Sequence, residues 1–212
     1  MKFTFRGVRG SIPSPGPRTA RYGGNTTCIE VRTDDDSLII LDAGSGIFSL
    51  AQQLPPGQPV DAHVFITHSH WDHIHGLPMF SPLFVAGNRM RLHGAYDAVA
   101  GRGIEHVMAV QLQNSYFPVS EAAMAASIEY RTLAPGDTVD VGGACVRGAE
   151  MNHPSSTWAT ASTAPAPRYS SAATMNRSTT CIRPAMPSTR LAQRATRSAR
   201  PASTRSSPAS TR

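Results

Sequence analysis

Short apolar runs separated by Gly, Pro and Asp fill residues 1–154 and predict a succession of short strands with a few helices. Strands are expected at Lys2–Val8, Cys28–Arg32, Ser37–Asp42, Ala62–Thr67, Arg89–Gly94, Ser127–Leu133, Thr138–Val141 and Ala144–Met151. Helices are expected at Ile47–Leu54, from about Asp72, and at Tyr96–Ala109. Strands first, then strands mixed with helices, indicate sheets that pack on each other with helices outside them.

This pattern is lost in residues 155–212. Of these 58 residues, 34 are Ala, Ser or Thr, nine are Arg and six are Pro. Only Ile182 and Leu191 represent Val, Ile, Leu and Phe. Such a segment buries too little apolar surface to offset roughly 1–2 kcal/mol of backbone entropy per residue. We therefore expect a globular core at 1–154 and a disordered or poorly packed tail at 155–212.

Two origins of this tail stay open: a natural disordered segment and a shifted reading frame, of which the second is favoured. Read one base out of frame, the codons of Trp158 and Ala159 must encode Gly, and those of Met175 and Asn176 must encode Glu. The codons around these two forced residues permit Leu-Gly-Tyr-Arg and, later, Gly-Asp-His-Glu-Pro. The second string is the one that matters for a metal site, because it supplies an Asp.

The net charge of +6 is unevenly distributed. Residues 155–212 carry nine Arg and no acidic residue, so residues 1–154 hold 11 Lys and Arg against 14 Asp and Glu, a balance of −3. The basicity therefore belongs to the tail and not to the core. The three cysteines, Cys28, Cys145 and Cys181, are widely spaced and are expected to be reduced thiols. With no apolar run of membrane-spanning length and no signal-peptide-like start, we expect a cytoplasmic protein without a membrane partner.

Four potential metal ligands lie within six residues, at His68, His70, Asp72 and His73. They follow the apolar run at 64–66. In a continuous strand, His73 would point away from the other three. If the chain leaves the strand and enters a helix near Asp72, all four side chains can converge. Imidazole nitrogen and carboxylate oxygen suit zinc and its neighbours, so the motif predicts a metal site.

The motif HxHxDH after an apolar strand resembles the signature of the metallo-β-lactamase superfamily. The longer string at 67–78 resembles its phosphodiesterase-like branch, which includes ribonuclease Z and cyclic-nucleotide phosphodiesterases. The strings at 6–13, 22–28 and 41–46 resemble the first strands and loops of that branch. The resemblance covers about residues 1–154 and does not extend into the tail.

The resemblance implies an α/β (α+β) fold, a four-layer αββα sandwich with a dinuclear metal site at one edge. Carried over by position, His68, His70 and His153 would bind the first metal, and Asp72 and His73 the second. Asp72 would also orient the nucleophile or accept its proton. Zinc is the expected metal, with manganese or iron as alternatives. Asp42 would be either a carboxylate that holds the metal loop or a turn or cap residue. The remaining histidines, His63, His75, His93 and His106, are interpreted as structural, with His75 near the mouth of the site.

The implied function is metal-dependent hydrolysis of phosphodiester bonds, in a cyclic-nucleotide or RNA-like substrate, through a metal-activated hydroxide. The family also needs a bridging Asp and a last His, but no Asp, Glu or His follows His153. The C-terminal part of the fold is therefore expected to be incomplete and the chain, as written, to have little activity. Two alternatives stay open: a hydrolase of thioesters, lactones or β-lactams, and a basic-tailed nucleic-acid-binding protein with a structural metal site. A small-molecule or nucleotide phosphodiester is the expected partner, and the chain could form a homodimer.

Overall fold

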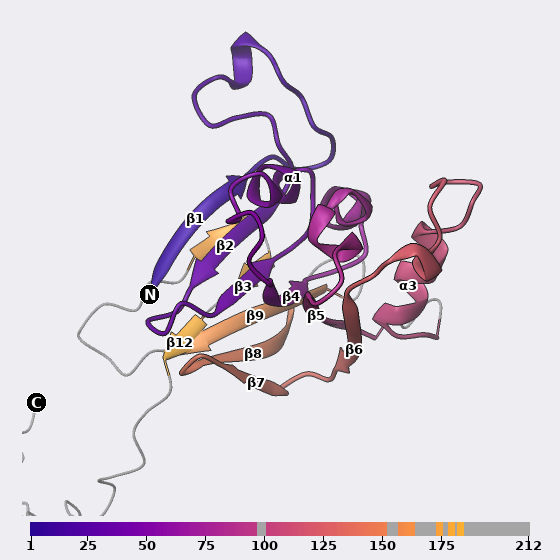
Figure 1. Cartoon of the computed structure of the whole chain (residues 1–212). Helices are drawn as coiled ribbons and strands as arrows, with labels where there is room; N and C mark the ends of the chain where they lie inside the picture. Colours follow the sequence, from indigo (N-terminus) through magenta and orange to yellow (C-terminus); the bar gives the residue numbers. More distant parts are fainter. Residues whose placement is uncertain (97–100, 152–156, 164–172, 176–177, 181, 185–212) are drawn as a thin grey trace, which may run out of the picture.

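The computed structural model describes residues 1–96, 101–151, 157–163, 173–175, 178–180 and 182–184. A six-stranded sheet in the order β1-β2-β3-β4-β5-β6 forms the centre of the fold (Figure 1). Its strands are β1 (Lys2–Gly7), β2 (Cys28–Arg32), β3 (Leu38–Leu41), β4 (Asp61–Ile66), β5 (Arg89–Ala95) and β6 (Ser127–Leu133). β1, β2 and β3 pair antiparallel, whereas β3, β4, β5 and β6 pair parallel. The parallel half brings the carboxyl ends of β3 and β4 to the same edge.

A second sheet of four strands has the order β12-β9-β8-β7. Its strands are β7 (Thr138–Val141), β8 (Ala144–Met151), β9 (Thr157–Thr163) and β12 (Ile182–Pro184), and a separate hairpin joins β10 (Ala173–Met175) to β11 (Ser178–Thr180). The α-helices are α1 (Gly46–Ala51), α2 (Trp71–Ile74) and α3 (Ile104–Gln111). Short 3-10 helices are η1 (Pro17–Thr19), η2 (Leu77–Met79), η3 (Ser81–Phe84) and η4 (Glu121–Ala123).

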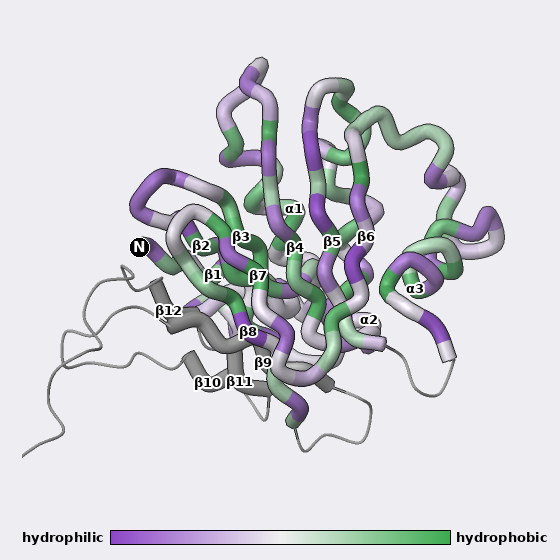
Figure 2. The backbone as a smooth tube through the Cα atoms, turned by 90° about the horizontal axis from the view of Figure 1, so that it is seen from below, coloured by the Kyte–Doolittle hydropathy of each residue, from purple (hydrophilic) through white to green (hydrophobic). Residues whose placement is uncertain are grey.

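The central strands of the first sheet are buried on both faces, because their alternate residues point into two different cores. On β3, Leu38 and Ile40 join the core beneath the helices, whereas Ile39 and Leu41 join the core between the two sheets. Side chains of β7 and β8 close that second core from the other side. The hydropathy view shows the apolar stretches along β3 and β4 at the centre (Figure 2). The layers among the described residues are therefore helix, sheet and sheet.

The predicted fold class is confirmed, since two sheets face each other with helices on the outside of the first (Figure 1). Within the described residues, all three α-helices contribute to the core on one side of the first sheet, and no helix is described over the outer face of the second. The fourth layer of the expected αββα sandwich is thus not among the residues that the structure describes.

Each of the eight predicted strands is present, with ends that differ by at most one residue. One helix was placed wrongly: α3 begins at Ile104 instead of Tyr96. Two glycines explain the later start. Gly101 has a left-handed φ of +66°, and Gly103 caps α3 in extended backbone, where an added Cβ would lie 2.2 Å from Oγ1 of Thr132. α3 therefore cannot extend backwards through Gly103 and Gly101 as a regular helix, and residues 97–100 lie outside the described residues.

The segment 155–212 is described only in part. β9 pairs with β8 over seven residue pairs from Met151↔Thr157 to Cys145↔Thr163, so this stretch is extended and continues the second sheet. It lies beyond the boundary expected at residue 154. Most of the remaining tail, and His153, lie outside the described residues, so the expected tail stays a prediction. Among the helices that the structure describes, none is long and apolar enough to cross a membrane.

Candidate metal centre

The HxHxDH motif occupies the connection between the end of β4 and the start of α2. β3 runs parallel to β4 with Leu41 opposite Phe65, so Asp42 and Thr67 come next to each other just beyond the two strands. The backbone N–H of Asp42 donates to the carbonyl of Phe65 at 2.8 Å. Asp42 has a φ of +59°, a left-handed conformation that Asp tolerates better than most residues. This turn aims its carboxylate at the motif.

The buried carboxylate of Asp42 holds the motif from behind. It accepts hydrogen bonds from the backbone N–H of Thr67 at 2.8 Å, from Oγ1 of Thr67 at 2.9 Å and from Nδ1 of His73 at 2.8 Å. Asp42 is only 3% exposed, so these bonds are sheltered from water. The interpretation of Asp42 as the residue that holds the loop is confirmed. It does not cap α1, whose N-cap is Ser45.

These bonds fix which nitrogen of each ring carries the proton. Because the carboxylate of Asp42 only accepts, Nδ1 of His73 is the protonated nitrogen. The hydroxyl of Thr67 donates to Asp42, so its oxygen accepts from Nδ1 of His68 at 3.1 Å. Both rings therefore present Nε2 as the electron-pair donor, which is the form that binds a metal.

The four motif side chains lie together in two pairs. Nε2 of His68 is 3.0 Å from Nδ1 of His70, and Nε2 of His73 is 3.5 Å from Oδ2 of Asp72. The rings of His68 and His73, one from each pair, have centroids 4.1 Å apart. The four side chains that were expected to converge therefore lie together as two pairs, which contact each other through the rings of His68 and His73. These pairs are also the ones assigned to the first and second metal.

Asp72 is held from the opposite side by the loop after β1. The backbone N–H of Ser11 donates to Oδ2 of Asp72 at 2.7 Å, and Ser11 has a left-handed φ of +72°. Burial would raise the pKa of Asp72, but the bond from Ser11 and the charge of His73 outweigh it, so the pKa is lowered. For His73, burial opposes protonation, but Asp42 and then Asp72 outweigh it and raise the pKa. Asp72 is thus kept as a carboxylate.

Two glycines let the loops of the centre approach each other. A Cβ on Gly44 would lie 2.2 Å from the carbonyl oxygen of Asp72, and one on Gly76 would lie 2.1 Å from the carbonyl oxygen of Gly44. Neither glycine has a left-handed φ, so close backbone approach, and not turn geometry, requires them. Sequence reasoning did not find this role, nor those of Ser11 and Thr67.

The residues present fit zinc in donor type and in pairing. Two nitrogens bound to one zinc at ~2.0–2.1 Å would lie about 3.3 Å apart, close to the 3.0 Å between His68 and His70. Within the described residues, no group of three His, Cys, Asp or Glu is arranged to hold a metal ion, so the donors converge in twos and not in threes. The third expected ligand of the first metal, His153, lies outside those residues. The assignment of His68, His70, Asp72, His73 and His153 as metal ligands stays a prediction.

His63 and His93 form a separate pair on β4 and β5, on the face between the sheets. Nδ1 of His63 lies 3.0 Å from Nε2 of His93, and His93 stacks on Phe65 with centroids 4.3 Å apart. Arg91 lies 3.2 Å from Nε2 of His63. These contacts bear out the structural interpretation of both histidines.

Known proteins match this chain in sequence and in fold. Residues 38–174 match the sequence profile of a family described as the β-lactamase superfamily domain. Ribonuclease Z of Haloarcula marismortui is 31% identical over 120 residues, which are 56% of this chain and 36% of that protein. The chain thus spans about a third of the length of this curated relative.

Solved structures show the same fold at low identity. The metallo-β-lactamase fold protein YhfI of Bacillus subtilis has a TM-score of 0.53 and 14% identity, over 76% of this chain and 56% of that chain. A diphosphatase of the PhnP family has a TM-score of 0.52 and 16% identity, over 76% of this chain and 62% of that chain. The described layers therefore correspond to a fold that is known from larger proteins.

Proposed function

Since the chain belongs to the β-lactamase superfamily domain family, we propose that it is a metal-dependent hydrolase that acts on phosphodiester bonds. Zinc is the proposed metal, with manganese or iron as alternatives. The proposed substrate class is a small-molecule or nucleotide phosphodiester. The similarity to a ribonuclease Z and to a diphosphatase supports phosphorus–oxygen chemistry over that of thioesters, lactones or β-lactams.

The observation that carries this proposal is the pair of donor sets held by Asp42. His68 and His70 form one set, and Asp72 and His73 form the other. The carboxylate of Asp42 fixes the tautomer of His73 directly. It fixes the tautomer of His68 through the hydroxyl of Thr67. A structural histidine cluster has no need for an arrangement that leaves Nε2 of both rings as the electron-pair donor.

In the proposed site, His68, His70 and His153 hold one metal ion, and Asp72 and His73 hold a second. The bound metal would supply a Lewis acid and lower the pKa of water. The protein's own groups do the rest. Asp42 keeps the His73 ring in its orientation, and the N–H of Ser11 keeps Asp72 in place as a carboxylate. The second oxygen of Asp72 could then orient the attacking water or accept its proton.

The second ion is incompletely held by this chain. No Asp, Glu or His follows His153 within these 212 residues, so Asp72 and His73 are the ligands that this stretch would offer to that ion. We therefore propose that the chain binds one metal tightly and hydrolyses slowly.

The test is metal analysis combined with hydrolysis of bis(p-nitrophenyl) phosphate. Protein dialysed against zinc should retain about one ion, and the variant His68→Ala/His70→Ala should lose both the ion and the hydrolysis. Asp34→Asn, at an exposed carboxylate far along the chain from the motif, is the control and should retain both the ion and the hydrolysis. Faster hydrolysis of a β-lactam, lactone or thioester than of the phosphodiester would overturn the substrate class. Zinc retained by the double variant would overturn the site.

A further inference from the structure

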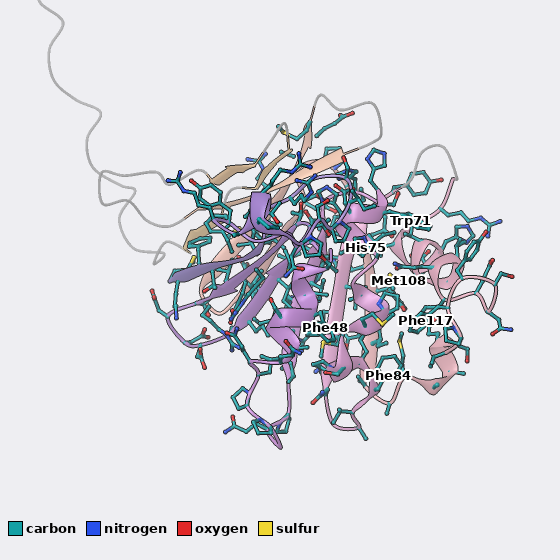
Figure 3. All side chains as sticks on the ribbon, turned by 90° about the horizontal axis from the view of Figure 1, so that it is seen from above. Phe48, Trp71, His75, Phe84, Met108 and Phe117 are labelled. Carbon is teal, nitrogen blue, oxygen red and sulfur yellow. The ribbon has the colours of Figure 1, made fainter. Side chains whose placement is uncertain are left out.

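A cleft of about 550 Å³ lies between α2 and α3, on the side of the first sheet that the helices cover. Its walls come from α2, η2, α3 and the segment after α3 that carries Tyr116. Figure 3 shows Trp71 and Phe117 on this side of the molecule. We call the residues that line the cleft the α2–α3 face. None of the four donors of the metal loop belongs to it, so this face is distinct from the candidate metal centre.

The α2–α3 face differs from the rest of the core in charge. None of its residues is Asp, Glu, Lys or Arg, although residues 1–154 hold 11 Lys and Arg and 14 Asp and Glu. Few charged residues combined with many aromatic residues and Met are typical of the centre of a protein–protein interface. Trp71, Met79 and Tyr116 are residues of this kind. The composition of the face therefore favours a protein partner.

Large apolar side chains project from the α2–α3 face. Trp71, Tyr116 and Met79 are 75%, 67% and 55% exposed, and Val110 is exposed beside them on α3. Since a large ring contributes ~150–250 Å², these four side chains together expose roughly 400–500 Å². Exposed apolar patches above a few hundred Å² mark interaction sites. The patch supplies more than half of the roughly 800 Å² that each partner buries in a stable interface, and the surrounding rim can supply the rest.

α3 carries apolar residues on two sides. Ile104 and Met108 are buried in the core beneath the helices, whereas Val107 and Val110 line the cleft on the other side. Glu105, in the first turn, is its only acidic or basic residue apart from a histidine. A surface helix normally has one apolar side and one charged side, and a helix that is apolar on both is normally covered on both. The outer side of α3 therefore lacks a cover that another molecule would provide.

The shape and charge of the α2–α3 face make it complementary to itself. The exposed rings of Trp71 and Tyr116 line a cleft that has room for a large ring. Two copies related by a two-fold axis can therefore each place a ring in the cleft of the other, as in most soluble homo-oligomers. The partner surface must also be free of charge, because an unpaired charge would lose its water there. A second α2–α3 face meets both conditions.

We propose that the chain forms a symmetric dimer in which the α2–α3 faces of two copies pack against each other. Trp71 and Tyr116 anchor the interface, and Val107 and Val110 of α3 pack around them. This inference goes beyond the proposed function and does not depend on it. A dimer without hydrolysis leaves the interface standing, whereas a monomer that hydrolyses phosphodiesters removes the interface and leaves the hydrolase.

Sedimentation equilibrium of the full chain at about 1–100 µM measures the association. We expect a dimer whose Kd changes little between about 0.1 and 0.5 M salt, because the contact is apolar. Tyr116→Ala should raise the Kd by at least about 10-fold, since the symmetric interface loses this ring twice. The matched control is Tyr22→Ala, which removes a ring of similar exposure, 72%, from the loop before β2 and should leave the Kd unchanged.

A second pair of variants introduces a charge on α3. Val110→Glu places a carboxylate within the α2–α3 face and should leave the chain monomeric. Ala109→Glu makes the same charge change at the neighbouring exposed position, which does not line the cleft, and should leave the dimer intact. Far-UV circular dichroism of both variants checks that each is folded. Equal loss of the dimer in both variants would contradict the proposed face.

Three other results would overturn the proposal. A chain that stays monomeric at about 100 µM would leave the face to a different partner. Association that disappears at about 0.5 M salt would belong to the basic segment 155–212. Association that survives Tyr116→Ala but is lost in Phe3→Ser/Phe5→Ser would place the interface on the exposed rings of β1.

Discussion

Asp42 and His73 are 31 residues apart in sequence, and the carboxylate of the first accepts a hydrogen bond from Nδ1 of the second at 2.8 Å. This bond joins the turn after β3 to α2. It places the proton of His73 on Nδ1. The other ring nitrogen, Nε2, is then the unprotonated one, and it faces Asp72. The orientation of the candidate donor His73 therefore depends on a buried carboxylate from a different part of the chain.

Asp42→Asn tests this dependence. The amide can present its NH₂ group to Nδ1 of His73, which would favour the other tautomer and turn Nε2 into a donor. We expect zinc affinity to fall by about 10- to 100-fold, as for other residues that support ligands. The measurement is a competition titration with a zinc chelator. Asp34→Asn, at an exposed carboxylate, should leave the affinity unchanged.

Thr67→Val tests the link between Asp42 and His68. Thr67 is 2% exposed, and its hydroxyl donates to Asp42 while accepting from His68. Valine has a similar shape but leaves these buried groups without their partner. The free energy of unfolding should fall by about 1–3 kcal/mol in urea denaturation. Thr138→Val, at an exposed position on β7, is the control, and an equal loss there would show that hydroxyl burial is not the cause.

Gly44→Ala tests the close packing of the loops. The added Cβ would lie 2.2 Å from the backbone oxygen of Asp72, which cannot move without displacing the metal loop. We expect a loss of about 3 kcal/mol in the free energy of unfolding, the upper range for overpacking. Gly10→Ala is the matched control, because outside its own chain neighbours the nearest atom to its Cβ would be Oδ2 of Asp72, at 4.0 Å. A tolerated Gly44→Ala with unchanged zinc binding would mean that the loops are looser than described.

The pair His63 and His93 predicts a loss of stability in weak acid. Arg91 always donates, so Nε2 of His63 accepts from it and Nδ1 of His63 donates to Nε2 of His93. Both rings are thus neutral in the folded state. Burial, then Arg91, lowers the pKa of His63 to about 4, and burial, then His63, lowers the pKa of His93 to about 3.

The direction of the pH effect on stability depends on whether the folded or the unfolded state binds protons at the higher pH. In the unfolded chain these histidines titrate near ~6.5, above their folded values, so the unfolded state gains protons as the pH falls. Stability is therefore fully present above about pH 6.5 and declines towards pH 4. We expect the free energy of unfolding to fall by about 2 kcal/mol between pH 7 and pH 4.5. This loss is smaller than the full sum of the two pKa shifts would give, because His63 is partly exposed to solvent. Urea melts at several pH values measure it, and His93→Phe should flatten the profile. An unchanged profile would assign the acid sensitivity to other groups.

Repair of the reading frame is the strictest test of the tail. A one-base change near codon 155 would replace the tail with a sequence that permits Gly-Asp-His-Glu-Pro and so restores a bridging carboxylate. We expect the metal content to rise from about one to about two ions per chain and hydrolysis of bis(p-nitrophenyl) phosphate to rise with it. If the unrepaired chain already binds two ions and turns over as fast, both the frameshift hypothesis and the ligand assignment are wrong.

The sequence predicted what local patterns encode. Alternation of apolar residues located the eight strands, and the spacing of His68, His70, Asp72 and His73 predicted their convergence. It did not predict the bond from Ser11 to Asp72, which spans 61 residues and exists only because the loop after β1 folds over the motif. The rings of Tyr116 and Phe117 likewise line a cleft between α2 and α3 because of the position of α3, whose start the pattern misplaced. Long-range contacts of this kind have no periodic signal.

The parallel pairing of β3 with β4 also has a consequence for folding order. Asp42 can reach Thr67 and His73 only after these two strands have paired across the segment that contains α1. Parallel pairing closes a long loop and is slow compared with hairpin formation. We therefore expect the connection at 67–73 to reach its final form only after β3 and β4 have paired. Added zinc should therefore slow unfolding and leave the refolding rate nearly unchanged.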